Sequence, residues 1–365
     1  MPQVVMTRPI LYDDPAIELL AELVSFPSLS HEEERVADFV EDYARKAGLA
    51  VHRLKNNVWF TLGEGETRLL LNSHLDVVPP SAEHPYDAFT PTIVDDKMYG
   101  RGTVDAKASG AAMMRAVVEL AQEGWKPEGG QVIVALTACE ETGGSYNGLE
   151  ELRPTLPLLS AALVGEPTQL RPCVAQKGLL ILNVHAHGQT AHAARAHLGD
   201  NAILRAARDL ARIADMQFEK EDPFLGKPTV TVTTIQGGTA RNVVPDRCTF
   251  TLDIRSTPAY THEELTELIA ERLESEVQVH SKRIVPVSTD PTSRIVQACR
   301  AALPEEEPFG SPTASDWIFL SDVPTVKIGP GPSERSHTAD EHIELDELVR
   351  AVEVYKGIIR SYFGS

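Results

Sequence analysis

Alternating apolar and polar stretches divide the first 170 residues into helices and strands. Apolar residues at helical spacing predict helices over Pro15–Val24 and Gly110–Glu123. Ser30 followed by Glu33 is typical of a capping box and predicts another helix, which ends near Gly48. Short apolar runs predict strands over Val51–Leu54, Val58–Leu62, Arg68–Asn72, Gln131–Thr137 and Ala161–Val164. This mixture of strands and helices predicts an α/β sheet.

The pattern changes beyond Pro172. Three alternating stretches predict strands and two helical stretches separate them, over Leu179–His187, Asn201–Ala214, Thr229–Ile235, Arg247–Arg255 and Thr261–Glu274. Two helices against an antiparallel sheet form a self-sufficient α+β unit. The α/β pattern then returns, with a helix, a strand and a closing helix over Ile295–Leu303, Thr325–Ile328 and Leu345–Tyr362. We therefore expect one domain in two parts, 1–172 and 285–365, with an inserted domain at 173–284.

Composition and charge restrict the class of protein. The 365 residues have 42% hydrophobic and 24% charged side chains, and no apolar run approaches the length of a membrane span. A net charge of −19 disfavours nucleic acid and anionic membranes as partners. The N-terminus lacks the pattern of an export signal, which predicts a cytoplasmic location. The four cysteines are scattered without a C-x-x-C pair, and we expect them to be reduced.

The first candidate chemistry follows a buried strand, in the stretch LLLNSHLDVVPP at 69–80. His74 and Asp76 are two residues apart, so on extended chain their side chains share one face. While His74 binds a metal through one ring nitrogen, Asp76 can accept the N–H of the other and fix the tautomer. The alternative is a surface histidine beside a solvated aspartate.

Carboxylates occupy similar positions elsewhere. Asp105 in GRGTVDAK lies at a loop-to-helix junction, where it could project into a cavity or cap the helix. Glu140 and Glu141 follow a buried strand, and adjacent residues on extended backbone point in different directions. One of them can therefore bind a cation while the other moves a proton. Glu166 follows the next strand, which predicts a site along one edge of the sheet.

With His337, these side chains give a mixed imidazole and carboxylate set without thiolate. Such a set suits Zn²⁺, Co²⁺ or Mn²⁺ in hydrolytic sites. Five ligands and one base fit two metals, with one carboxylate bridging and a shared water as the nucleophile.

The motifs in the chain resemble those of a known family. NSHLDVVP, YGRGTVDAK, ACEETGG, VGEPT, GQTAHAA, NVVPD, LDIRSTP and SHTADE occur in order and extend over nearly the entire chain. They resemble the co-catalytic zinc amidohydrolases, which include acetylornithine deacetylase, succinyl-diaminopimelate desuccinylase, aminoacylase and glutamate-releasing carboxypeptidases. NNVWF, VGEPTQ and GPGPSERSHTADE look most similar to the acetylornithine deacetylase branch. The resemblance implies a zinc-peptidase-like catalytic domain with a mixed sheet flanked by helices, plus an inserted α+β lid and dimerisation domain.

The resemblance also implies a metal-binding role for five residues. His74 and Glu166 are expected to bind one zinc, and Glu141 and His337 the other. Asp105 would bridge the two metals, with a cis peptide bond following it. Cobalt is an alternative metal for one or both positions.

The remaining roles that the resemblance implies concern catalysis and substrate. Glu140 would be the general base, and Asp76 would support the site. His192 would reach across a homodimer to stabilise the oxyanion, although its sequence context alone favours a surface histidine. Four residues would contact the substrate, chiefly its α-carboxylate: Arg255, Asn242, Arg241 and Gly331.

These roles predict a dinuclear zinc or cobalt amidohydrolase that acts on a small N-acyl amino acid. The first candidate reaction converts N-acetyl-L-ornithine to L-ornithine and acetate in arginine biosynthesis. Rival substrates are succinyl-ornithine, succinyl-diaminopimelate, acetyl-lysine, acetylcitrulline or a dipeptide. Asp316 could attract a cationic ornithine tail or cap a helix. A non-catalytic metal-binding protein is a weaker alternative, because all six site residues and Asp76 are present.

Overall fold

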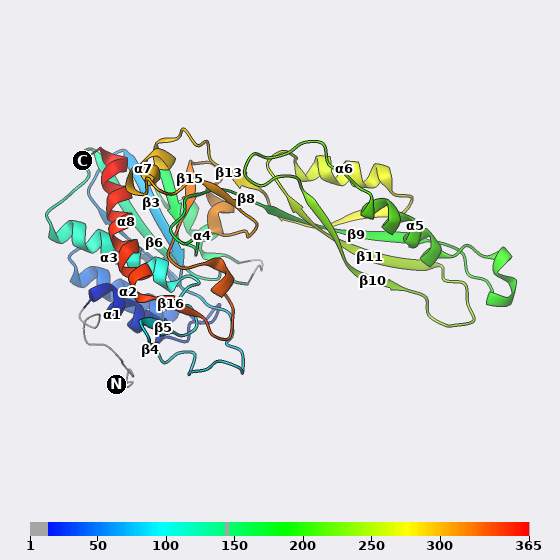
Figure 1. Cartoon of the computed structure of the whole chain (residues 1–365), viewed down its shortest axis with the longest axis horizontal. Coiled ribbons are helices and arrows are strands. Elements are labelled where there is room, and N and C mark those ends of the chain that lie inside the picture. The colour runs from blue at the N-terminus through cyan, green and yellow to red at the C-terminus, as the bar shows by residue number, and fades with distance from the viewer. Residues whose placement is uncertain (1–13, 143–145, 365) are drawn as a thin grey trace. The chain divides into compact units, whose positions relative to one another are not determined.

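The computed structural model describes residues 14–142 and 146–364, which form two compact units (Figure 1). The first contains the described residues up to 174 together with 289–309 and 315–364. The second contains 175–288 and the short segment 310–314. The N-terminal stretch from which we expect no export signal lies largely outside the described residues, as do Gly143 and Gly144 of the ACEETGG motif.

A mixed sheet forms the centre of the first unit, with strands in the order β1-β2-β6-β3-β7-β15-β8. The strand bounds are β1 Ala50–Leu54, β2 Asn57–Leu62, β3 Thr67–His74, β6 Gly130–Thr137, β7 Ala161–Val164, β8 Cys173–Gln176 and β15 Thr325–Lys327. The four strands β6, β3, β7 and β15 run parallel, and β2 and β8 flank them in the antiparallel direction. The parallel strands are almost wholly buried, which is why they read as continuous apolar runs in the sequence. The α/β prediction for this part is confirmed.

Helices cover this sheet. Their bounds are α1 Pro15–Val24, α2 Glu34–Lys46, α3 Lys107–Gln122, α4 Gly148–Leu152, α7 Arg294–Ala302 and α8 Leu345–Phe363, with short 3₁₀ turns at Arg153–Thr155, Asp316–Leu320 and Ser333–Arg335. α3 packs on β3 and β6 and is itself contacted by α1 and α8, whereas α2 packs on β1 and β2. A separate three-stranded sheet consists of β4 Thr92–Val94, β5 Lys97–Tyr99 and β16 His342–Glu344.

The predicted capping box at Ser30 is wrong. α2 begins at Glu34, and Ser30 donates its hydroxyl to Oδ2 of Asp76 at 2.7 Å. Oε1 of Glu33 accepts the main-chain N–H of His31 at 2.8 Å and that of Cys139 at 3.2 Å. Both side chains therefore contact residues near the ends of β3 and β6 and do not cap the helix that follows them.

The second unit is a four-stranded antiparallel sheet with two helices. The sheet order is β10-β11-β9-β12, and the element bounds are β9 Gly178–His187, α5 Ala202–Ala214, β10 Thr229–Gly237, β11 Arg247–Ser256, α6 His262–Arg272 and β12 Glu276–Ile284. Every second residue of β9 and β11 is buried, and these side chains form one core with residues of α5 and α6. This confirms the predicted α+β unit. The short elements Ala193–Leu198, β13 Val287–Ser288 and β14 Phe309–Ser311 complete the described structure.

Candidate metal centre

Several predicted site residues of the first unit lie at the carboxyl ends of three neighbouring parallel strands. β3 ends at His74 itself, Glu140 and Glu141 follow β6, and Glu166 follows β7. In open α/β sheets this edge is where ligands bind, because the loops there project side chains from several strands into one region. The structure therefore brings these residues to one edge of the sheet, as the strand pattern predicts.

Asp105 lies between two histidines. Its Oδ1 is 3.3 Å from Nε2 of His74, and its Oδ2 is 3.3 Å from Nε2 of His337. Asp105 lies two residues before α3, which begins at Lys107, and the Asp105–Ala106 peptide bond is cis. Each carboxylate oxygen therefore faces a different imidazole, which is the arrangement expected of a bridging ligand.

Each histidine also faces its own glutamate. Nε2 of His337 lies 3.0 Å from Oε1 of Glu141, and Nε2 of His74 lies 3.7 Å from Oε1 of Glu166. The ligand atoms of His74, Asp105 and Glu141 all lie within 4.8 Å of one another. The five side chains therefore form one cluster around Asp105, and their division between two metals stays a prediction. Nitrogen and oxygen donors in this number fit Zn²⁺ or Co²⁺.

The electrostatics of the cluster also fit a cation. Burial, followed by the charge of Asp105, raises the pKa of Glu166 to about 8, and burial likewise raises the pKa of Glu141 and Glu140. Hydrogen bonds to Asp105 and Glu141 raise the pKa of His337 to about 10. Carboxylates crowded in a buried site retain protons unless positive charge compensates them, and divalent cations would supply that charge.

Asp76 supports the segment that carries Glu140 and Glu141. Its Oδ1 accepts the main-chain N–H of Glu140 at 3.0 Å, and its Oδ2 accepts that of Glu141 at 3.1 Å. Nδ1 of His74 lies 2.9 Å from the main-chain oxygen of Asp76 and 3.5 Å from its Oδ1. The main-chain carbonyl, rather than the carboxylate, is therefore the nearer partner of the imidazole. The sequence analysis predicted instead that the carboxylate of Asp76 would accept the imidazole N–H of His74.

Two further residues around this segment were missed in the sequence. Oε1 of Glu33 accepts the N–H of Cys139 and lies 3.2 Å from its Sγ, and the hydroxyl of Ser30 binds Asp76. The main-chain N–H groups of three consecutive residues, 139 to 141, are therefore each held by a carboxylate. Cys139 has a φ of 58°, a left-handed conformation that turns the chain just before Glu140. The only signal for these roles was the Ser30–Glu33 spacing.

All four cysteines are free and buried. Burial raises the pKa of the Cys139 thiol to about 12, with the neighbouring Glu33 adding to the shift. A thiol in this state stays protonated at neutral pH and is a poor nucleophile. The absence of disulfides agrees with the expectation from the sequence.

His192 and Asn242, in the second unit, lie in adjacent loops. The N–H of Ala193 donates to the main-chain oxygen of Asn242 at 2.9 Å, and His192 forms an isolated β-bridge with Val243. Nδ1 of His192 accepts the N–H of Ala194 at 3.1 Å, so the neutral imidazole has its proton on Nε2. The ring is therefore a hydrogen-bond donor at its exposed end.

The other predicted substrate contacts differ in their surroundings. Arg255 is half-exposed, and its guanidinium binds both oxygens of Asp253, at 2.9 and 3.2 Å. Arg241 is exposed. Gly331 has a φ of +73°, a left-handed conformation that favours glycine, and a Cβ there would have to displace Cδ1 of Ile343, which lies 2.9 Å away. Their roles toward a substrate stay predictions.

Asp316 is a buried residue. Its Oδ1 accepts the amide N–H of Asn147 at 2.6 Å, and its Oδ2 lies 3.3 Å from the hydroxyl of Thr137. Burial raises its pKa to about 6. Ser315 is the residue that caps the following 3₁₀ turn, because its Oγ accepts the N–H of Trp317. An enclosed carboxylate with these partners is poorly suited to bind an ornithine ammonium group.

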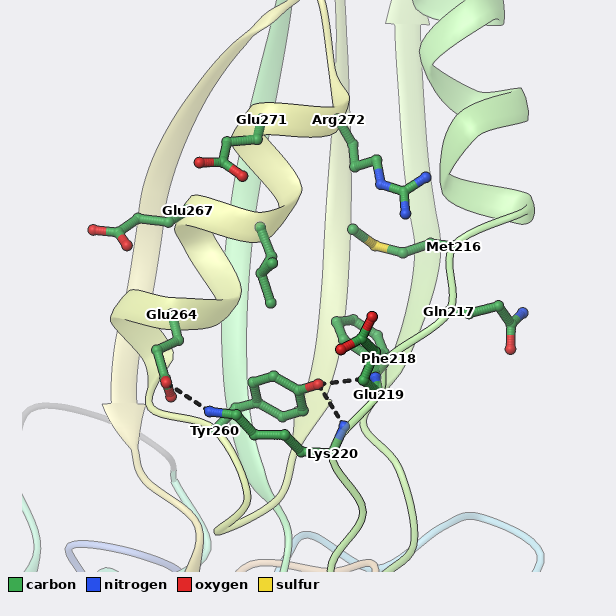
Figure 2. Close-up of a pocket in the computed structure, with 11 residues that line it drawn as sticks. Met216, Gln217, Phe218, Glu219, Lys220, Tyr260, Glu264, Glu267, Glu271 and Arg272 are labelled. Atoms are coloured by element: carbon green, nitrogen blue, oxygen red, sulfur yellow. Dashed lines mark hydrogen bonds and ion pairs between the residues drawn. The ribbon is translucent and has the colours of Figure 1, made fainter.

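A separate pocket lies in the second unit (Figure 2). It is lined by one side of α6 and by residues 216–220. The hydroxyl of Tyr260 accepts the N–H groups of Glu219 and Lys220, at 3.0 and 2.8 Å, and Nζ of Lys220 lies 2.7 Å from Oε1 of Glu264. None of the predicted site residues lines this pocket, so we assign the chemistry to the cluster around Asp105.

Comparisons with known proteins show the family of the chain. The profile of Peptidase family M20/M25/M40 matches residues 70–361. A succinyl-diaminopimelate desuccinylase of Rhodospirillum centenum is 28% identical over 380 residues, covering 95% of this chain and 97% of the relative. An aminopeptidase PepT of Bacillus cereus has a similar fold, with a TM-score of 0.78, 21% identity and coverage of 96% and 98%. A dinuclear metal-binding peptidase of Bacillus subtilis superposes with a TM-score of 0.74, 16% identity and coverage of 94% and 96%.

These comparisons bear on the family and on the branch that the sequence motifs indicated. The family that the motifs indicated is confirmed, whereas similarity to the acetylornithine deacetylase branch in particular is not established by them. Within residues 14–142 and 146–364, every helix is too short or too polar to cross a bilayer.

Proposed function

Because this chain belongs to Peptidase family M20/M25/M40, we propose that it is a metal-dependent hydrolase that cleaves the amide bond of a small N-acyl amino acid. The observation that carries the proposal is the position of Asp105. Its two oxygens each lie 3.3 Å from a different histidine Nε2. A carboxylate placed in this way is suited to bridge two cations, with one oxygen bound to each.

We assign His74 and Glu166 to one cation and His337 and Glu141 to the other, with Asp105 common to both. When bound, two zinc or cobalt ions would polarise the scissile carbonyl and lower the pKa of a water molecule. Of the remaining site residues, Asp76 holds the main chain of Glu140 and Glu141 in place. The donor set and the crowded carboxylates support this assignment.

Glu140 is the residue that moves protons in this proposal. It is adjacent in sequence to the ligand Glu141, and its main-chain N–H is fixed by Asp76. Its carboxylate accepts a proton from the attacking water and later delivers a proton to the leaving amine. We therefore assign the base role to Glu140 and the ligand role to its neighbour Glu141, whose Oε1 lies 3.0 Å from Nε2 of His337.

We assign the substrate contacts to residues outside the metal cluster. The Nε2–H of His192 is available as a donor to the developing oxyanion, and we assign this role to His192 of the partner in a homodimer. Asn242, in the neighbouring loop, together with Arg241, Arg255 and Gly331, would contact the α-carboxylate. Arg255 must release or share Asp253 to do so.

Two acyl groups are candidates. The motifs favour N-acetyl-L-ornithine, with L-ornithine and acetate as products in arginine biosynthesis. The name of the Rhodospirillum centenum relative favours an N-succinyl substrate such as N-succinyl-diaminopimelate. The enclosed position of Asp316 removes one argument for an ornithine side chain, so the succinyl group is a serious second candidate.

A substrate panel tests the proposal. The zinc-loaded and cobalt-loaded proteins are incubated with acetyl, succinyl and carbamoyl derivatives of ornithine, lysine and diaminopimelate and with dipeptides, and free amine is measured. Hydrolysis by wild type but not by Glu140→Gln supports the proposal, and the fastest substrate identifies the acyl group. Absence of turnover on every amide, or equal turnover by Glu140→Gln, contradicts it.

A further inference from the structure

A buried carboxylate, Glu341, binds the loop that carries Asp105. Oε1 of Glu341 accepts three main-chain N–H groups, from Gly102 at 3.0 Å, Val104 at 3.0 Å and Asp105 at 3.2 Å. Its other oxygen, Oε2, pairs with the guanidinium of Arg101, which is also buried. Charged acceptors form stronger hydrogen bonds than neutral ones, so this single side chain strongly restricts the loop.

The main chain on both sides of these contacts is fixed as well. The N–H of Gly100 donates to the main-chain oxygen of Glu341 at 3.2 Å, and β16 continues the pairing with β5 from His342 onward. Gly102 has a φ of +86°, and a Cβ there would lie 2.7 Å from Cγ1 of Val77. The loop therefore has little freedom to move relative to the segment that contains Glu341.

His337 belongs to that same segment, four residues before Glu341. Its Nε2 lies 3.3 Å from Oδ2 of Asp105. Glu341 thus connects the segment that contains His337 to the loop that contains Asp105. A displacement of the loop would alter both halves of the cluster together.

We propose that Glu341 is a positioning residue, which holds Asp105 between His74 and His337 so that both metal positions depend on it. This inference rests on the proposed function, because it assumes that the cluster binds two cations. Partners that orient metal ligands typically contribute ten- to hundredfold to metal affinity or activity when they are changed. The contacts of Glu341 are with Arg101 and with the main chain of this loop, so we assign its effect to the position of Asp105.

The test uses an isosteric change. Glu341→Gln keeps the shape of the side chain and one carbonyl oxygen but loses the charge that binds Arg101 and the three N–H groups. We expect both equivalents of zinc to bind about ten- to hundredfold more weakly to the metal-free variant than to wild type. Glu166→Gln, which changes a ligand of one cation, is expected to weaken one equivalent only.

Asp209 provides a matched control. This buried carboxylate accepts the N–H groups of Glu274 and Ser275, each at 3.0 Å, and pairs with Arg212 at 2.9 Å, all within the second unit. Asp209→Asn removes a similar set of contacts from a similar environment. It is expected to lower the unfolding temperature of the protein and to leave both zinc affinities at the wild-type values.

Zinc binding is measured by competition with a chromophoric chelator, and the visible spectrum of the cobalt-loaded proteins reports ligand geometry. Weaker binding of both equivalents and an altered cobalt spectrum in Glu341→Gln, with neither change in Asp209→Asn, support the inference. Wild-type affinities and spectrum in Glu341→Gln, or equal losses in Asp209→Asn, overturn it. If Glu341→Gln does not fold, Glu341→Asp, which keeps the charge but withdraws its oxygens from the loop, is expected to show the same loss. A wild-type chain that binds fewer than two equivalents refutes the proposed function itself.

Discussion

Oδ1 of Asp76 accepts the main-chain N–H of Glu140 at 3.0 Å. This contact joins the loop after β3 to the loop after β6, so one carboxylate connects the strand that ends at His74 with the segment that carries the base. Asp76 is fully buried, and Ser30 and Glu141 supply its other hydrogen bonds. The position of the base therefore depends on side chains that need not touch substrate.

Glu140→Gln tests the role of the base. The amide cannot accept the proton of the attacking water, so we expect kcat to fall about 10²- to 10⁴-fold while metal content is unchanged. Steady-state kinetics and elemental analysis measure the two quantities. Glu128→Gln, which changes an exposed glutamate in a loop, is the control and is expected to retain full activity. Retained activity in Glu140→Gln would remove Glu140 from the mechanism.

Asp76→Asn tests the support of the acidic segment. Its new NH₂ group must face one of two main-chain donors, Glu140 N–H or Glu141 N–H, so one hydrogen bond is replaced by a repulsive contact. We expect metal affinity and kcat/KM each to fall about ten- to hundredfold. Chelator competition and kinetics provide the measurements. Wild-type values for both would assign Asp76 a role in packing alone.

Ser30→Ala removes the hydroxyl that donates to Asp76 at 2.7 Å. Because hydrogen bonds to charged groups contribute about 1.5–3 kcal/mol, we expect the free energy of unfolding to fall within or just below that range. Urea unfolding followed by circular dichroism measures the change. Ser25→Ala is the control, since the Ser25 hydroxyl makes an exposed contact with the main-chain oxygen of Glu22. Equal decreases in the free energy of unfolding for the two changes would show that the contact with Asp76 contributes no more to stability than the exposed contact of Ser25.

His262 predicts a pH dependence of stability. Burial lowers its pKa below the ordinary value of 6.5, and its Nε2 lies 2.8 Å from the hydroxyl of Ser256. Below pH 6.5 the unfolded chain therefore binds a proton that the folded chain does not. The contribution of His262 to stability is fully present above pH 6.5 and is lost as the pH falls toward the folded pKa.

The measurement is the free energy of unfolding at several values of pH between 7.5 and 5, where the decrease should be smaller in His262→Gln than in wild type. His280→Gln changes an exposed histidine on β12 and is expected to keep the wild-type slope. Identical slopes in wild type and His262→Gln would contradict the assignment.

The sequence predicted those parts of the fold that have a strong local pattern. The buried parallel strands β3, β6 and β7 were placed correctly because their apolar runs are distinctive, and so were the residues at or just after their ends, including His74 and Glu166. β12 was missed, since this edge strand is mostly exposed and has no clear alternation. Ser30 and Glu33 were assigned to a helix cap because the capping-box spacing carries no information about partners distant in sequence.

Glu341 illustrates the same limit within the site. It is the last residue of the SHTADE motif, but the motif gave it no role, because it binds main-chain N–H groups of Gly102, Val104 and Asp105, which are donors that every loop contains. The motifs identified the side chains that face the cluster. The side chains that hold the loops, such as Glu341, can be identified only from the tertiary structure, because their partners are distant in sequence.

The metal content of the purified chain and of Asp105→Asn tests the central claim most directly, because the two oxygens of Asp105 each lie 3.3 Å from Nε2 of a different histidine. Both proteins are reconstituted with zinc, freed of excess metal and analysed by plasma mass spectrometry. The structure predicts two zinc ions per wild-type chain and the loss of both, or a marked weakening of both, in Asp105→Asn. Fewer than two ions in wild type, or two ions bound equally tightly by Asp105→Asn, would contradict the account.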